Sequence, residues 1–97
     1  MSDHILKTWS NAWRAVESGV KSFEYRRDDR GFKVGDVLVL RQWDPAKRQC
    51  NLRPLSGSTA LSDYIDLRVR VTFILRGLHG VPDGYCVMSI ERLDEPA

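Results

Sequence analysis

The chain has 97 residues, of which 42% are hydrophobic and 29% are charged, and its formal net charge at pH 7 is +2. This length predicts a single domain over residues 1–97 that buries one core but not two, and the composition is not that of a disordered chain. The small net charge excludes a strongly basic, nucleic-acid-like composition, so any electrostatic argument has to rest on local clusters of charge.

The chain contains two cysteines, Cys50 and Cys86, without a secretory leader, so we expect a cytoplasmic protein in which both thiols are reduced. Their spacing from each other and from His4 and His79 fits no zinc pattern, so we expect no metal and no cofactor. No apolar run approaches the length of a membrane span, and the N-terminus lacks the apolar core of a signal peptide. We therefore expect no membrane partner.

The first predicted elements are a short strand over residues 5–8 and a helix. Ser10 is placed as the N-cap of this helix, which runs to about Ser18. Gly19 follows as its C-terminal cap, because glycine adopts a positive φ without a Cβ penalty. The predicted buried stripe of the helix consists of residues at helical spacing, namely Trp9, Ala12, Trp13 and Val16.

A strand begins after this glycine, and it carries a dense group of charges. Phe23 and Tyr25 alternate with Glu24 and Arg26, so one face is apolar and the other carries opposite charges. One interpretation is a surface ion pair of little energetic consequence. The other is a functional cluster, because functional groups tend to sit beside turns of this kind. The full group of charges consists of Lys21, Glu24, Arg26, Arg27 and Arg30.

The middle of the chain is predicted to alternate between turns and short strands. Residues 27–33 form a loop, and residues 34–36 form a turn into the next strand. Residues 37–40 are apolar on both faces, which indicates a strand covered on both sides. A turn over residues 44–47 then leads to a short returning strand over residues 49–52.

In the last part of the chain, residues 53–63 are rich in proline, serine and glycine and predict an exposed loop. Residues 67–76 form the clearest strand, followed by a loop over residues 77–84, a last strand over residues 85–90, and a tail from Asp94 that frays. On the clearest strand, the predicted core side consists of Val69, Val71, Phe73 and Leu75, and the predicted solvent side carries Arg68, Arg70 and Arg76. One helix with several short strands predicts a small curled sheet or barrel packed against the helix.

Four residues at fixed spacing resemble a known signature. Gly19, Lys21, Glu24 and Arg26 match the G-x-K-x-x-E-x-R pattern of the ASCH domain, a branch of the PUA-like superfamily. Residues 4–7, 28–36 and 84–90 also resemble an ASCH-like family catalogued as a domain of unknown function, in the same order. The resemblance covers nearly the whole chain and implies a mixed α/β (α+β) fold, in which a small PUA-like β-barrel has one principal helix packed beside it.

The resemblance also implies a site. It implies that the signature residues Lys21, Glu24 and Arg26 line a cleft between helix and barrel. Lys21 could hold a phosphate or act as a base, and Arg26 offers a planar fork suited to phosphate. Glu24 could orient either cation, accept a base amino group or transfer a proton. In the alternative interpretation, Glu24 and Arg26 pair simply to fix the barrel. The full candidate ligand-binding set is His4, Lys7, Lys21, Glu24, Arg26, Arg30 and Tyr85.

The leading functional prediction is an RNA- or nucleotide-binding module, which the resemblance implies. Lys21, Arg26 and Arg30 would hold phosphate, and Glu24 would read an edge of a base. A single-stranded or flipped nucleotide suits a small barrel better than a duplex groove does.

Two other classes of function remain open. Some ASCH relatives are small amidohydrolases, which implies a hydrolase acting on modified nucleosides or RNA, with Lys21 as nucleophile or base and Glu24 as its proton partner. Amidohydrolase-like members carry a hydroxyl residue where this chain has Glu24, and Ser22 is the nearest substitute. The third class is a protein-interaction module. Its contact surface would be the row of arginines at positions 68, 70 and 76, which could instead follow a nucleic-acid backbone or form a solvated face.

Overall fold

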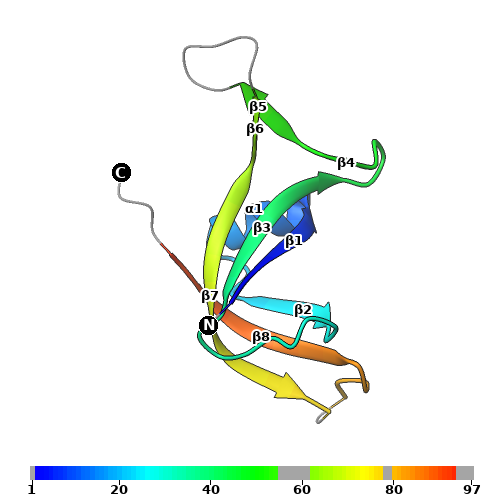
Figure 1. Ribbon diagram of the computed structural model, residues 1–97, viewed down its shortest axis with the longest axis vertical. Coiled ribbons are helices and arrows are strands. Elements are labelled where there is room, and N and C mark those ends of the chain that lie inside the picture. The colour runs from blue at the N-terminus through cyan, green and yellow to red at the C-terminus, as the bar shows by residue number, and fades with distance from the viewer. Residues whose placement is uncertain (1, 55–61, 78–79, 94–97) are drawn as a thin grey trace.

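The computed structural model of this protein describes residues 2–54, 62–77 and 80–93. The chain consists mostly of strands, which form a curled half-barrel sheet with one short helix beside it (Figure 1). The small barrel-like sheet with one helix predicted from the sequence is therefore confirmed at this level. In chain order the elements are β1 (Asp3–Trp9), α1 (Ser10–Glu17), β2 (Phe23–Arg27), β3 (Val37–Asp44), β4 (Gln49–Cys50), β5 (Leu52–Pro54), β6 (Ser62–Tyr64), β7 (Asp66–Arg76) and β8 (Tyr85–Arg92).

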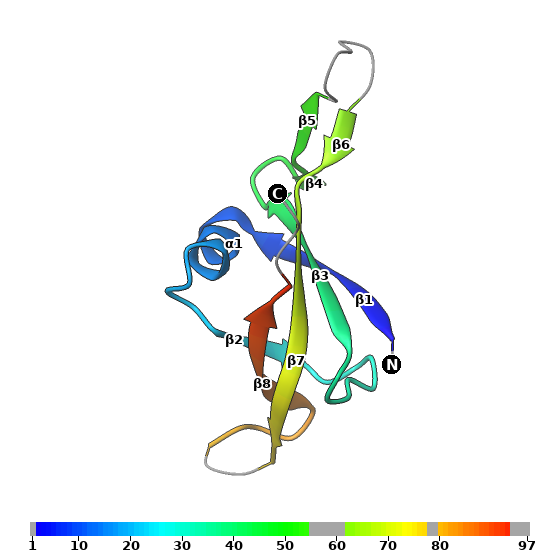
Figure 2. The same ribbon diagram turned by 90° about the vertical axis from the view of Figure 1, so that its left-hand side faces the viewer.

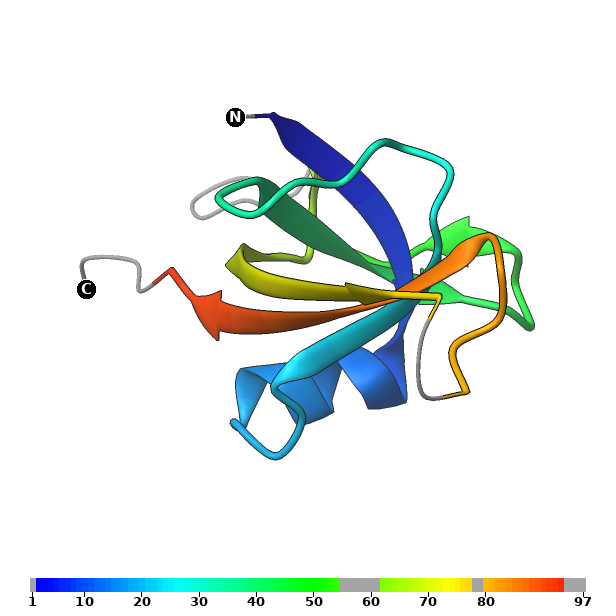
Figure 3. The ribbon, with the colours of Figure 1, turned by 90° about the horizontal axis from the view of Figure 1, so that it is seen from below.

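The main sheet has the strand order β1-β3-β7-β8-β2, and β4 pairs with β3 beside this path. β1 runs parallel to β3, whereas the other neighbours are antiparallel. The strands curl round so that the sheet is strongly curved when it is seen from below (Figure 3). β1 and β2 are the two ends of this path, and side chains from β2 and the loop after it reach the edge of β1. Arg26 and Arg30 donate hydrogen bonds to the carbonyl oxygens of Lys7 and Ile5.

The helix α1 packs on one side of the curled sheet (Figure 2). Trp13 and Val16, three residues apart, are its buried residues, and the indole Nε1 of Trp13 donates to the carbonyl oxygen of Leu40 at 2.8 Å. The prediction that Trp9 belongs to the buried stripe was wrong, because its side chain is 58% exposed. Trp9 ends β1 and has extended backbone angles, so it is not part of the helical repeat.

The glycine after the C-terminal end of the helix was predicted correctly, but the residue at its N-terminal cap was not. Trp9, not Ser10, is the N-cap, and it makes no side-chain capping hydrogen bond. At the other end Gly19 adopts a φ of 85°, as predicted, just after the C-cap residue Ser18. The chain can therefore turn sharply toward β2, and the amide of Lys21 donates to the carbonyl oxygen of Ala15.

The strand β7 contains a register shift that overturns part of the predicted pattern. The shift falls between Val71 and Phe73, and an irregularity of this kind moves the following side chains to the opposite face. Phe73 is therefore 61% exposed instead of buried, and Leu75 lies opposite Val87 on the outer face. Arg76 lies opposite the buried Cys86, so it does not share a face with the two earlier arginines of the strand.

The predicted loop over residues 53–63 was wrong at both ends. β5 and β6 pair with each other as a separate two-stranded sheet, which extends away from the main sheet (Figure 1). The rest of that loop and the tail from Asp94 lie outside the described residues.

The inner face of the curled sheet and the helix enclose one core. The strand over residues 37–40 is nearly all buried, in agreement with its apolar pattern. Within the described residues, no helix has the length and apolar character needed to cross a bilayer. The core cluster consists of Leu6, Trp13, Val16, Phe32, Leu38, Leu40, Leu67, Val69, Val71, Cys86, Met88 and Ile90.

Candidate functional site

The charged face of β2 points into the half-barrel. Glu24 is only 2% exposed, whereas its neighbours Phe23 and Tyr25 are 46% and 51% exposed. Glu24 pairs with Met88 of β8, a fully buried core residue, so the two lie on the same inner face. A surface ion pair is therefore excluded for Glu24. The alternation in the sequence indicated two faces of different character, but it did not indicate which of them faces the core.

The buried carboxylate of Glu24 holds one cation on each oxygen. Oε2 accepts from Lys21 Nζ at 2.6 Å, and Oε1 accepts from Arg26 Nε at 2.8 Å. The side chains of Lys21 and Arg26 are 22% and 24% exposed, against 3% for Glu24. A buried carboxylate is strongly destabilising without such partners. We call these three residues the triad. Two cations and one carboxylate give the triad a formal net charge of +1.

The two cations make further hydrogen bonds that fix their positions. Lys21 Nζ also donates to the carbonyl oxygen of Phe23 at 2.7 Å. Arg26 donates through Nη1 to the carbonyl oxygen of Lys7 and through Nη2 to the hydroxyl of Thr8. Within the described residues these contacts use two of the three N–H groups of the ammonium and three of the five of the guanidinium. The cations are thus held rigidly and still have N–H groups to offer to a ligand.

A cleft of about 420 Å³ opens beside the triad. The end of β1 and the start of α1 form one wall, and β2 with the segment before it forms the other. Because Trp9 and Tyr25 are more than half exposed, the cleft has aromatic surface as well as cations. We call it the triad cleft. Its lining residues are Lys7, Thr8, Trp9, Asn11, Ala12, Lys21, Glu24, Tyr25 and Arg26.

A second hollow lies next to the triad cleft along the edge of β1. Its volume is about 470 Å³, and it shares Lys7 and Arg26 with the triad cleft. Arg30, from the loop after β2, enters it and donates to the carbonyl oxygen of Ile5 at 3.0 Å. We call this hollow the edge groove. Its lining residues are Ile5, Leu6, Lys7, Arg26, Arg30, Arg41, Cys50 and Tyr64.

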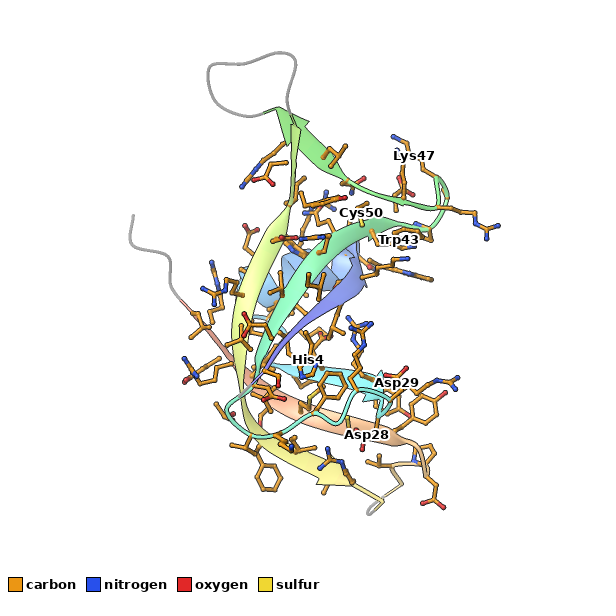
Figure 4. All side chains as sticks on the ribbon, in the orientation of Figure 1. His4, Asp28, Asp29, Trp43, Lys47 and Cys50 are labelled. Atoms are coloured by element: carbon orange, nitrogen blue, oxygen red, sulfur yellow. The ribbon has the colours of Figure 1, made fainter. Side chains whose placement is uncertain are left out.

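His4 lies apart from both hollows, in a cluster that ties the first residues of the chain to the loop before β3 (Figure 4). Its Nε2 is 2.9 Å from Oδ2 of Asp36, and its ring packs edge-on against Phe32. Asp36 is 2% exposed and also accepts from the backbone amides of Ser2 and Lys33. Burial alone raises the pKa of Asp36, but the three hydrogen bonds outweigh it, so the pKa lies below its ordinary value of 3.8.

Tyr85 is close to the triad cleft only through a neighbouring ring. It packs against Tyr25, with ring centroids 5.6 Å apart, and the guanidinium of Arg27 lies 5.8 Å from its centroid.

Of the seven predicted site residues, the structure thus places four in the triad cleft and Arg30 in the edge groove. The four are Lys7, Lys21, Glu24 and Arg26.

Several lining residues were not predicted as site residues. Thr8 supplies the hydroxyl in the triad cleft, whereas Ser22, the predicted substitute, does not line it. Trp9 follows Ile5 and Lys7 at every second position of β1, and this alternation is the signal that would have placed it. Arg41 and Tyr64 have no such local signal, because strand pairing and the curl of the sheet bring them to the edge groove.

The described part of the chain holds no group of three or more histidine, cysteine, aspartate or glutamate residues close enough to bind a metal ion. The cations and aromatic rings of the two hollows are instead groups that bind anions and planar ring systems.

Comparison with known proteins gives one family. A sequence model of the family described as "Domain of unknown function (DUF3850)" matches residues 3–90, a range that includes every residue lining the two hollows. A search among curated proteins found no match.

Proposed function

The chain belongs to the family described as Domain of unknown function (DUF3850), and we propose that it is an RNA- or nucleotide-binding module. We further assign it to the ASCH branch of the PUA-like superfamily. The G-x-K-x-x-E-x-R spacing over residues 19–26 and the curled half-barrel with one helix support this assignment.

The observation that carries the proposal is the triad cleft itself. Lys7 adds a third cation to the triad, so three positive charges and one negative charge give the cleft a formal net charge of +2. Phosphate is well matched to such a site, because charge-assisted hydrogen bonds are short and strong. The exposed rings of Trp9 and Tyr25 supply surfaces on which an unstacked base can lie. A cleft with both features suits a nucleotide better than it suits either an apolar ligand or a free inorganic anion.

The residues have different roles in this proposal. Glu24 orients the two triad cations and does not contact the ligand, because both of its oxygens are engaged and it is nearly inaccessible. Lys21 and Arg26 present fixed N–H groups to a phosphate. Lys7 is exposed, and its ammonium lies 4.3 Å from the ring centroid of Trp43, so it can move onto a ligand without breaking an ion pair.

The test is a binding titration at low salt with a labelled nucleoside monophosphate and a labelled short single-stranded RNA. We expect binding that weakens as salt is raised, and roughly tenfold weaker binding in Lys7→Ala and Lys21→Ala, the cost of one charged hydrogen bond. Lys47→Ala is the matched control, because Lys47 is exposed in the turn after β3 and lines neither hollow (Figure 4). Absence of binding at low salt, or equal affinity in all three variants, would refute the proposal.

One contact supports a second candidate, a small hydrolase acting on modified nucleosides or RNA. The 2.6 Å contact between Lys21 Nζ and Glu24 Oε2 is short enough for direct proton transfer. Lys21 already donates to two acceptors, however, so a role as nucleophile would require it to leave both. A screen for nucleoside deacylation distinguishes the two functions. The hydrolase is supported only if turnover is detected and is lost in Lys21→Ala with Lys47→Ala unaffected.

A further inference from the structure

The triad cleft and the edge groove share two cationic residues. Lys7 and Arg26 line both hollows, so the two hollows are adjacent and a ligand bound in one can extend into the other. Their volumes, about 420 and 470 Å³, are similar. The proposed nucleotide fills only the first of them, which raises the question of what the second one binds.

The lining of the edge groove is strongly positive. It contains four cationic side chains and no aspartate or glutamate. Arg26 is paired with Glu24, and Arg41 is paired with Asp66. In the described part of the chain, Lys7 and Arg30 lie within ion-pair distance of no carboxylate. These two side chains therefore give the groove an uncompensated positive charge.

The edge of β1 sets the spacing of two guanidinium groups. Arg26 donates to the carbonyl oxygen of Lys7, and Arg30 donates to that of Ile5. Two residues along a strand span about 6.6 Å. Adjacent phosphates of a flexible single strand can match a separation of this size. Within the described residues, Arg26 keeps two of its five N–H groups after its contacts with Glu24, Lys7 and Thr8, and Arg30 keeps four after its contact with Ile5. These N–H groups stay available to a ligand.

An aromatic ring also lines the edge groove. Tyr64 is 43% exposed, and the guanidinium of Arg41 stacks 3.9 Å from its ring centroid. Two hydrogen bonds of 2.9 Å from Arg41 to Asp66 hold this guanidinium in place. A ring fixed on one face by a guanidinium is a firm surface for stacking a base, as in proteins that bind single strands.

We propose that the edge groove is a second phosphate subsite, and that the ligand is a single-stranded oligonucleotide whose backbone runs from the triad across Lys7 to Arg30. This inference rests on the proposed function and extends it from a mononucleotide to a strand. Arg30 is its diagnostic residue, because Arg30 lines only the edge groove.

The first test measures affinity against ligand length, with uridine monophosphate and uridylate oligonucleotides of two, three and four residues. We expect affinity to rise with length in the unmodified protein. In Arg30→Ala the affinity for the longer ligands should be roughly tenfold lower, and their slope of log affinity against log salt concentration should be smaller in magnitude by about 0.7. The affinity for the monophosphate should be unchanged. Arg27→Ala is the matched control. This substitution also removes one positive charge, but Arg27 lies on the outer face of β2 and lines neither hollow.

The outcomes separate the two proposals. If the monophosphate and the oligonucleotides both fail to bind, the proposed function fails. If the monophosphate binds but affinity does not rise with length, or if Arg30→Ala weakens every ligand equally, the second subsite is refuted and the proposed function stands.

A second test needs no substitution. Cys50 (Figure 4) lines the edge groove and is partly exposed. Cys86, in contrast, is fully buried in the core. Saturating tetranucleotide should slow the alkylation of Cys50 severalfold, and saturating monophosphate should not. An unchanged rate with the tetranucleotide bound would overturn the inference.

Discussion

The guanidinium of Arg26 donates to the carbonyl oxygen of Lys7 at 3.1 Å and so joins the two end strands of the half-barrel, β2 and β1. The same side chain contacts Glu24 and lines the triad cleft. Arg26 therefore combines the two interpretations of the sequence, since it fixes the barrel and also presents N–H groups to a ligand.

Arg26→Lys should separate these two contributions. Lysine keeps the charge but cannot reach the three acceptors that the planar guanidinium contacts together. We expect the free energy of unfolding to fall by about 2 kcal/mol, measured by urea denaturation. Arg27→Lys, on the outer face, should change it by less than about 0.5 kcal/mol. Equal stability of the two variants would show that the contacts of Arg26 do not hold the barrel closed.

Glu24→Gln should be strongly destabilising. The substitution leaves Lys21 and Arg26 without the buried carboxylate that compensates them, and loss of one partner from a buried ion pair costs roughly 3 kcal/mol. Glu91→Gln on the exposed part of β8 is the control. Chemical denaturation of both proteins at pH 7 gives the comparison. A loss in Glu24→Gln no larger than in the control would mean that the triad is not coupled to folding.

The lowered pKa of Asp36 predicts a loss of stability in acid. A carboxyl group whose pKa is lower in the folded state stabilises the protein above its ordinary pKa, and this contribution disappears as the pH falls through the folded value. The loss should therefore begin near pH 4 and grow toward lower pH. Asp36→Asn should be about 2 kcal/mol less stable at pH 7, because an amide NH2 group replaces one of the two acceptor oxygens, so that either Ser2 or both Lys33 and His4 lose their acceptor.

The measurement for Asp36 is denaturation at several pH values between 7 and 2.5. The difference between the unmodified protein and Asp36→Asn should shrink as the pH falls. A constant difference over this range would contradict the role of the carboxylate. Asp63→Asn, at an exposed position of β6, serves as the control for a general change of charge.

The two thiols should differ sharply in reactivity. Burial raises the pKa of the Cys86 thiol, and its side chain is fully enclosed, so both the thiolate fraction and access are low. Iodoacetamide at pH 8 should modify Cys50 in the folded protein and Cys86 only after unfolding, as mass spectrometry of the peptides can show. Modification of both at similar rates in the folded protein would contradict the core position of Cys86.

Much of the fold follows from local sequence patterns. The helix, its glycine cap and the strands at residues 5–8, 37–40, 67–76 and 85–90 are confirmed, because each has a clear period or a turn residue that requires a special φ. Two errors on β7 have a common origin, namely the predicted core side of Phe73 and Leu75 and the predicted shared face of the three arginines. The extra residue between Val71 and Phe73 shifts the alternation of β7, and no local feature of the sequence marked that position.

Only part of the candidate site could be predicted from the sequence. Lys21, Glu24 and Arg26 are near one another in the chain, so their motif identified them together. The edge groove joins Lys7 of β1, Arg30 of a loop, Arg41 of β3 and Tyr64 of β6, and strand pairing together with the curl of the sheet makes these segments neighbours. Because a pattern along one strand contains no information about that curl, the groove could not be predicted.

The pairing of β2 also bears on the order in which the protein assembles during synthesis. Lys21, Glu24 and Arg26 leave the ribosome early, yet the sheet partner of their strand is β8, which spans Tyr85–Arg92. Pairing over so long a separation closes late in folding. A nascent or truncated chain that ends before β8 therefore contains every triad residue but lacks the strand that positions them.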